Sequence, residues 1–134
     1  MKTFWAIALV LLVWNLAGLV AFIVQVRSDP GDLGDAVTAE AFATMPAWTW
    51  CAYAVATIAG TAGALALLKK RKVAWLLFAL SLTGVILQFG WTILGFGILE
   101  RKGAGAIVFP FVIALMAVLG TTYCRYLTKH DVLR

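Results

Sequence analysis

Four long uncharged runs, rich in apolar residues, alternate with short charged segments along this chain. The runs cover residues 3–26, 41–68, 73–99 and 103–124. A helix needs about 20 apolar residues to cross a bilayer, and each run is long enough to supply them. The pattern predicts an all-α integral membrane protein with transmembrane helices at about 3–26, 46–68, 73–97 and 106–127, and an external loop at 27–45.

The connections that follow the second and third runs are short. Short connections place consecutive helices side by side in opposite directions. We therefore expect an antiparallel up-down four-transmembrane-helix bundle. The runs leave no room for a separate soluble domain, so residues 1–134 are expected to form a single membrane domain.

The connection between the second and third runs carries four consecutive cations. Lys and Arg near the ends of spans resist export, so this loop is expected on the cytoplasmic side and to determine the topology. Both termini then lie on the cytoplasmic side as well. The expected cytoplasmic cations are Lys2, Lys69, Lys70, Arg71, Lys72, Arg125, Lys129 and Arg134, and the external ones are Arg27, Arg101 and Lys102.

Composition supports a membrane protein over a soluble one. The chain is 63% hydrophobic and has a mean hydropathy of +0.97, against about 45–50% apolar residues in soluble domains. The net charge of +5 sits at the ends of spans, which favours the lipid bilayer as partner and argues against nucleic acid. The first run exceeds the 7–15 residues typical of a signal peptide core, so we expect it to be retained.

The loop at 27–45 is the longest polar segment. Asp29, Pro30 and Gly31 are residues typical of a turn, and Asp35 is placed to cap a short helix over 36–43. Leu33, Val37 and Phe42 would lay this helix on the membrane surface. The loop's carboxylates lack the spacing of a calcium-binding loop, so we interpret them as solvated. The two cysteines, Cys51 and Cys124, are expected near opposite faces of the membrane, too far apart for a disulfide.

Small residues recur at four-residue spacing in the second and fourth runs. Such stripes let transmembrane helices approach closely, although Ala and Gly are also simply common in membrane helices. We expect the following small residues to pack between helices: Gly18, Ala56, Gly60, Ala64, Gly84, Ala114 and Ala117.

The apolar cores of the runs contain no Asp, Glu, Lys, Arg or His, and the only histidine, His130, falls in the C-terminal tail. No nucleophile–base pair, phosphate loop or metal-ligand spacing is visible. We therefore expect no enzyme, metal or cofactor site. Polar groups that lipid cannot satisfy should point inward, either to join helices or to line a small-molecule path; the candidates are Asn15, Gln25, Ser81, Gln88 and Thr92.

Several segments together resemble a known family. They are residues 14–18 with Phe22 and Gln25, the 45–48 and 60–63 segments, the basic loop, 78–82 with Gln88, and 132–134. The chain is similar to a group of small four-span inner-membrane proteins of Gram-negative bacteria, often labelled "sugar transporter". The resemblance implies a bacterial inner-membrane location. The pair His130 and Asp131 departs from the basic or Gly-containing tail of many relatives, and no mechanism carries over.

Two functions follow from these patterns. The first is a non-enzymatic membrane component that associates with itself or with another membrane protein. The alternative is a small-solute, sugar-like transporter that works as an oligomer. A water-accessible cavity ringed by Asn15, Gln25 and Gln88 would favour the transporter, and a dry bundle with an exposed apolar groove would favour the accessory component.

Overall fold

The computed structural model describes residues 2–29, 32 and 34–133. The expected turn at Pro30 and Gly31, the apolar contact of Leu33 and the position of Arg134 lie outside these residues. The main elements of the described chain are all helices. In order they are α1 (Lys2–Arg27), α2 (Ala36–Thr44), α3 (Ala47–Leu68), α4 (Val73–Gly90), the π-helix η2 (Trp91–Gly95), α5 (Ile98–Lys102), the 3-10 helix η3 (Ala104–Ile107) and α6 (Val108–Lys129).

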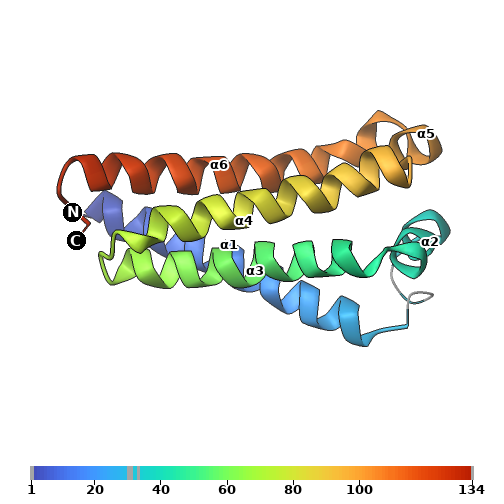
Figure 1. The fold of residues 1–134 in the computed structure, drawn as a ribbon, viewed down its shortest axis with the longest axis horizontal. Helices are drawn as coiled ribbons and strands as arrows, with labels where there is room; N and C mark the ends of the chain where they lie inside the picture. The colour runs from blue at the N-terminus through green and yellow to red at the C-terminus, as the bar shows by residue number, and fades with distance from the viewer. Residues whose placement is uncertain (1, 30–31, 33, 134) are drawn as a thin grey trace.

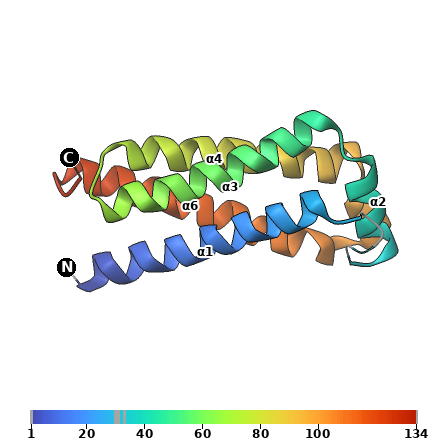
Figure 2. The ribbon, with the colours of Figure 1, turned by 90° about the horizontal axis from the view of Figure 1, so that it is seen from below.

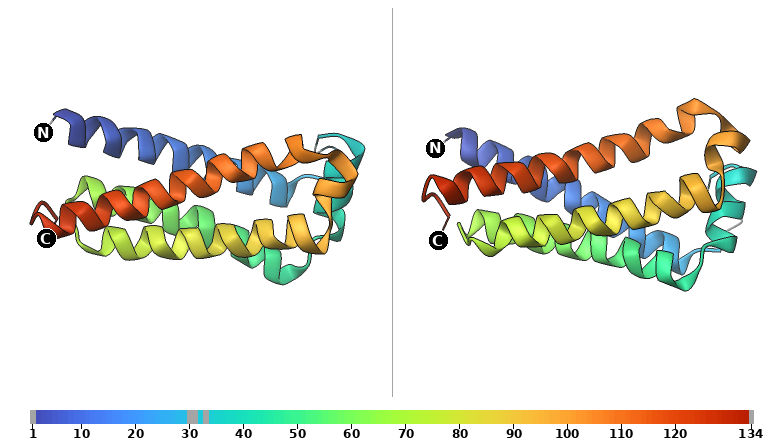
Figure 3. Two further views of the ribbon diagram at one scale, coloured as in Figure 1. Left: turned by 90° about the horizontal axis from the view of Figure 1, so that it is seen from above. Right: turned by 45° about the horizontal axis from the view of Figure 1, so that its top comes forward.

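Within the described residues, four helical segments are long and apolar enough to cross a membrane: α1, α3, α4 with η2, and α6. Successive long helices run in opposite directions in Figure 1, and both chain termini lie at the same end. We call this end the termini end. The short helices α2 and α5 gather at the opposite end, here called the α2 end, as Figures 2 and 3 also show. The chain is thus an all-helical, multi-pass membrane protein.

The order of packing is α1 on α3, α3 on α4, and α4 on α6. In the described part of the chain, α1 and α6 are not among the closely packed pairs. The four long helices therefore form an incompletely closed arrangement, with a seam between the first and the last of them. This seam determines where the molecule is hollow.

The termini end is the well-packed half of the molecule. Its core includes the start of α1, the end of α3, the start of α4 and the end of α6. Phe78 of α4 is the largest fully buried side chain, and its ring lies against Gly63 and Gly120. The basic loop closes this end, where Lys70 lies over the rings of Phe4 and Trp5 at 5.5 and 5.8 Å.

The third span differs from the single helix expected at 73–97. The α-helical part ends at Gly90, and the next turn widens, because the backbone N–H of Phe96 donates to the carbonyl of Trp91 at 2.8 Å. The ring of Trp91 lies where a side chain at Gly95 would be, so the wide turn depends on glycine there. Gly97 then takes a positive φ of 78°, which ends the span before residue 97.

The short helix α2 is capped by Asp35, whose carboxylate accepts the backbone N–H of Thr38 at 2.8 Å. Phe42 of this helix faces the long helices. The ring of Phe42 lies 5.8 Å from that of Trp50 in α3 and helps to line a cavity. As a result, α2 covers the end of the long helices.

Candidate functional site

A cavity of about 430 Å³ lies between the four long helices in the half of the molecule nearer the α2 end. Ligand pockets in proteins commonly measure about 300–1,000 Å³, so this space suits a small molecule. Aromatic side chains from α1, α2, α4 and α6 form much of its wall. The polar members of the wall are Asn15, Gln25, Thr38, Tyr53, Thr57, Ser81 and Gln88, and the other aromatic members are Trp14, Phe42, Phe78, Phe89 and Phe109.

Gln88 of α4 is the most informative residue of the wall. The residue is 8% exposed, yet its side-chain amide makes no hydrogen bond to any residue that the structure describes. Its polar atoms are not sealed in, because among the described side chains only Thr49 has a fully enclosed oxygen without a partner. A buried polar group without a partner is costly. The amide of Gln88 is therefore open to a ligand or to water in the cavity.

Asn15 of α1 lies across the cavity from Gln88, at the end of the cavity nearer the termini. Its side-chain N–H donates to the carbonyl of Leu11 in its own helix at 2.7 Å, which leaves Oδ1 as an acceptor. That oxygen occupies the place where a Cβ on Gly60 would be. Ser81 lies beside it and donates to the carbonyl of Ala56 at 2.6 Å. Glycine at 60 thus makes room for two polar side chains.

Gln25 and Tyr53 form the end of the wall nearest α2. The hydroxyl of Tyr53 donates to Oε1 of Gln25 at 2.6 Å, which links α3 to α1. Phe22 packs edge-on against Tyr53 with ring centres 4.9 Å apart, and Trp50 stacks on Tyr53 at 6.1 Å. With Phe42 from α2, these aromatic rings form a packed cluster at the α2 end of the cavity.

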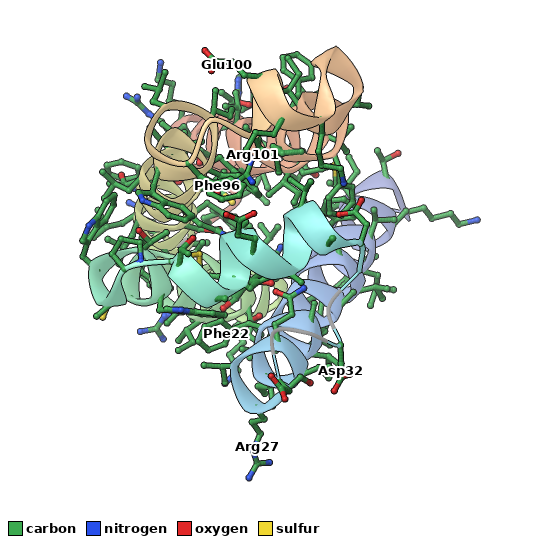
Figure 4. The ribbon with its side chains drawn as sticks, turned by 90° about the vertical axis from the view of Figure 1, so that its right-hand side faces the viewer. Phe22, Arg27, Asp32, Phe96, Glu100 and Arg101 are labelled. Atoms are coloured by element: carbon green, nitrogen blue, oxygen red, sulfur yellow. The ribbon has the colours of Figure 1, made fainter. Side chains whose placement is uncertain are left out.

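Two ion pairs hold α2 to α5 across the α2 end. Glu40 pairs with Arg101 at 2.5 Å, and Asp35 pairs with Lys102 at 2.7 Å. Figure 4 shows α2 lying across the ends of the long helices, with Arg101 on one side of it and Phe22 on the other. The hydrogen bond from Lys102, supported by the N–H of Thr38, lowers the pKa of Asp35 to about 2. Arg101 and Lys102 thus both face acidic partners.

The structure brings together four of the five polar residues singled out from the sequence. Asn15, Gln25, Ser81 and Gln88 all line the cavity. Thr92 is the exception, because it belongs to the π-helix and its hydroxyl donates to the carbonyl of Gln88 at 3.1 Å.

The predicted packing residues lie in different surroundings. Gly18, Ala56 and Ala117 line the cavity, while Ala64 is fully buried in the well-packed half. Gly84 lies against the backbone of α3, and Gly60 makes room for Asn15. Ala114 is half-buried on α6.

Other wall residues were not apparent from the sequence. Tyr53 and Thr57 of α3 and Phe109 of α6 contribute to the wall, but each reads as an ordinary residue of a membrane helix. The sequence signal that could have found Tyr53 and Thr57 is their four-residue spacing, which continues to Thr61, whose hydroxyl lies 3.3 Å from the carbonyl of Asn15.

The cavity wall is chemically neutral. Its described part contains no Asp, Glu, Lys, Arg or His, and no group of three or more His, Cys, Asp or Glu among the described residues could hold a metal ion. Cys51 and Cys124 are both free, with Cys51 exposed and Cys124 buried. The wall can offer amide and hydroxyl hydrogen bonds, aromatic faces and methyl groups. It suits an uncharged ligand, since a charge would be desolvated there without a counter-ion.

A second hollow follows the seam between α1 and α6 toward the termini end. This side groove has a volume of about 690 Å³ and is open along the molecular surface. Its wall is mostly apolar. The residues that line it are Ala6, Ile7, Val10, Leu11, Met116, Leu119, Thr122, Tyr123 and Tyr126.

Comparison with known proteins returns no relative. No protein-family model, curated protein or solved structure matches the chain.

Proposed function

We propose that this multi-pass membrane protein binds an uncharged small molecule in the cavity between its spans, as a carrier does. The observation that supports this most directly is the buried amide of Gln88, which faces the cavity and has no partner in the described chain. A sugar-like solute belongs to the uncharged class. A single chain encloses the cavity, so an oligomer is not needed to form the binding site.

The termini end is well packed and the cavity lies toward the α2 end, which indicates the end at which the cavity would open. Phe78 closes the bottom of the cavity and is also part of the packed core. The cover formed by α2 closes the top. A carrier must open its site to one side at a time, and in this conformation the side nearer to opening is the α2 end.

We propose further that the chain is an up-down bundle in a bacterial inner membrane with both termini in the cytoplasm. The basic loop and the termini lie at the same end. The described cations at this end outnumber those at the α2 end, as the positive-inside rule requires for a cytoplasmic face. The site then opens away from the cytoplasm.

Binding of a matched set of small probes tests the proposal. Benzyl alcohol is neutral, whereas benzoate and benzylammonium have similar shapes and carry opposite charges. Protein in lipid nanodiscs should bind benzyl alcohol, and the fluorescence of Trp14 in the cavity wall should report it. Gln88→Leu should weaken binding about tenfold, because one good hydrogen bond to the ligand is lost.

A control variant separates this effect from a general change in α4. Thr83→Val removes a hydroxyl from the exposed face of the same helix, where Thr83 donates to the carbonyl of Ala79 at 3.0 Å. It should bind like the parent. Equal binding of the neutral and the charged probes, or unchanged affinity in Gln88→Leu, would refute a neutral site at this position.

The accessory component remains a second candidate because of the side groove. An apolar groove that one membrane helix could enter is suited to association with a second copy or with another membrane protein. The test uses the variants Val10→Cys and Leu119→Cys. A cross-link between these positions of different copies in native membranes would support this function. Groove cysteines that react only within one chain would exclude self-association through the groove.

A further inference from the structure

The side groove and the cavity adjoin each other between α1 and α6. Met116 lines both of them. Leu11 lines the groove, and its carbonyl accepts the hydrogen bond from Asn15, which lines the cavity. The two hollows are therefore neighbours, with the flexible side chain of Met116 in the wall of each.

The groove and the cavity differ in chemistry. The groove offers mostly apolar side chains from both helices together with Tyr123 and Tyr126 of α6, and the hydroxyl of Thr122 donates to the carbonyl of Val118 in its own helix at 2.9 Å. The cavity offers the free amide of Gln88 and the acceptor oxygen of Asn15. A single occupant that satisfies both parts has an apolar chain and an uncharged hydrogen-bonding head.

We propose that the cavity and the side groove together bind one neutral single-chain lipid, with its head at Gln88 and its acyl chain along the groove. This inference rests on the proposed function, because it assumes that the cavity binds a neutral ligand. The groove extends from Met116 to Tyr126, ten residues of helix or about 15 Å, which gives room for much of an acyl chain. The head then lies toward the α2 end, in the orientation of a lipid from that leaflet.

A second copy of the chain fits the groove and the cavity less well than a lipid does. A helix about 10 Å wide could cover the groove, but the amide of Gln88 lies behind it in the cavity and would still lack a partner. A lipid whose head passes the side chain of Met116 would bring a hydrogen-bonding group to that amide. The buried amide therefore favours a lipid over a protein as the occupant.

Photolabelling tests the inference. The probe is a monoacylglycerol with a diazirine in its acyl chain, in phosphatidylcholine vesicles that contain the purified protein. Labelled peptides should come from the facing sides of α1 and α6. A fatty acid that carries the same diazirine has a charged head and should label these peptides several-fold less.

Matched variants locate the chain. Val10 lines the groove and Val20 lies on α1 outside it, and both are 59% exposed. Val10→Trp should fill the groove and reduce monoacylglycerol labelling at least about fivefold, whereas Val20→Trp should not. Leu119→Trp in α6, with Leu80→Trp in α4 as its control, repeats the test if a Val10 variant fails to fold; these leucines are 51% and 49% exposed.

Three outcomes would overturn the inference. They are equal labelling of all exposed helix faces, equal effects of Val10→Trp and Val20→Trp, and a chain-to-chain cross-link through the groove. Benzyl alcohol separates these failures from a failure of the proposed function. If it binds in a Gln88-dependent way while the groove is not labelled, the neutral site stands and only the lipid inference is wrong. If neither probe binds, both are wrong.

Discussion

Glycines of this chain have unequal roles, although they look alike in the sequence. A Cβ on Gly84 would come within 2.6 Å of the carbonyl oxygen of Ala52 and 2.8 Å of the nitrogen of Ala56, both backbone atoms of α3. A Cβ on Gly90, in the same helix, would meet nothing within 4 Å. The small-residue spacing indicates helix contact in general, but the distances show which glycine has no room for a methyl group.

Gly84→Ala should therefore destabilise the protein by about 1–3 kcal/mol, because α3 and α4 must move apart to admit the methyl group. Gly90→Ala should leave stability unchanged or raise it slightly, since alanine favours the helix and finds open space. Thermal unfolding in detergent measures both. A Gly84→Ala variant as stable as Gly90→Ala would show that the close contact between α3 and α4 is absent in the protein.

At the scale of elements, α2 is held in place by charges that lie far apart in the sequence. Glu40 and Arg101 are 61 residues apart, and so no local pattern reveals their pairing. The sequence does reveal that α2 is a helix and that Asp35 caps it, because capping is a local property. It does not reveal that the helix covers a cavity, since that depends on how α1, α3 and α5 are placed around it.

Asp35→Asn should loosen α2 without unravelling it. Asparagine caps helices as well as aspartate does, so the variant loses mainly the ion pair with Lys102. Amide hydrogen exchange in α2 should become a few-fold faster at neutral pH. Asp32→Asn removes a charge from the same loop and should have no effect on α2. Equal exchange in the two variants would mean that the ion pair does not hold α2.

The same pair predicts a pH dependence. The pKa of Asp35 is lowered from 3.8 to about 2 by Lys102 and Thr38. A lowered pKa in the folded state means that the pair stabilises α2 fully above about pH 4 and ceases to do so as the pH falls through about 2. The difference in exchange between the parent and Asp35→Asn should be constant from pH 7 to about 4 and vanish near pH 2. A difference that disappears by pH 5 would contradict this assignment.

For the whole molecule, the four membrane-length helices could be predicted from the sequence because uncharged runs are a one-dimensional signal. The cavity could not, because it arises from the order in which the helices pack. With α1 packed on α3 and α6 on α4, the first and last helices leave a seam. The polar residues Asn15 and Gln88 could be singled out, but the aromatic wall around them looked like ordinary membrane sequence.

Orientation in the membrane is also a property of the whole molecule. The basic loop 69–72 supplies much of the charge difference between the two ends. Its replacement by neutral residues should yield mixed orientations or poor accumulation. Two C-terminal fusions measure this in bacterial cells, one to a reporter active only in the cytoplasm and one to a reporter active only outside it. The parent should activate the first alone, and an unchanged pattern in the variant would mean that other charges determine the topology.

The central claim is that the cavity between the spans holds an uncharged ligand at Gln88. Native mass spectrometry of the protein released from membranes tests it most directly. Each chain should carry one non-covalent, uncharged molecule, and the Gln88→Leu variant, checked for folding by thermal unfolding, should lose most of it. Chains of bare mass from both proteins, or an equal load on the parent and the variant, would contradict the claim.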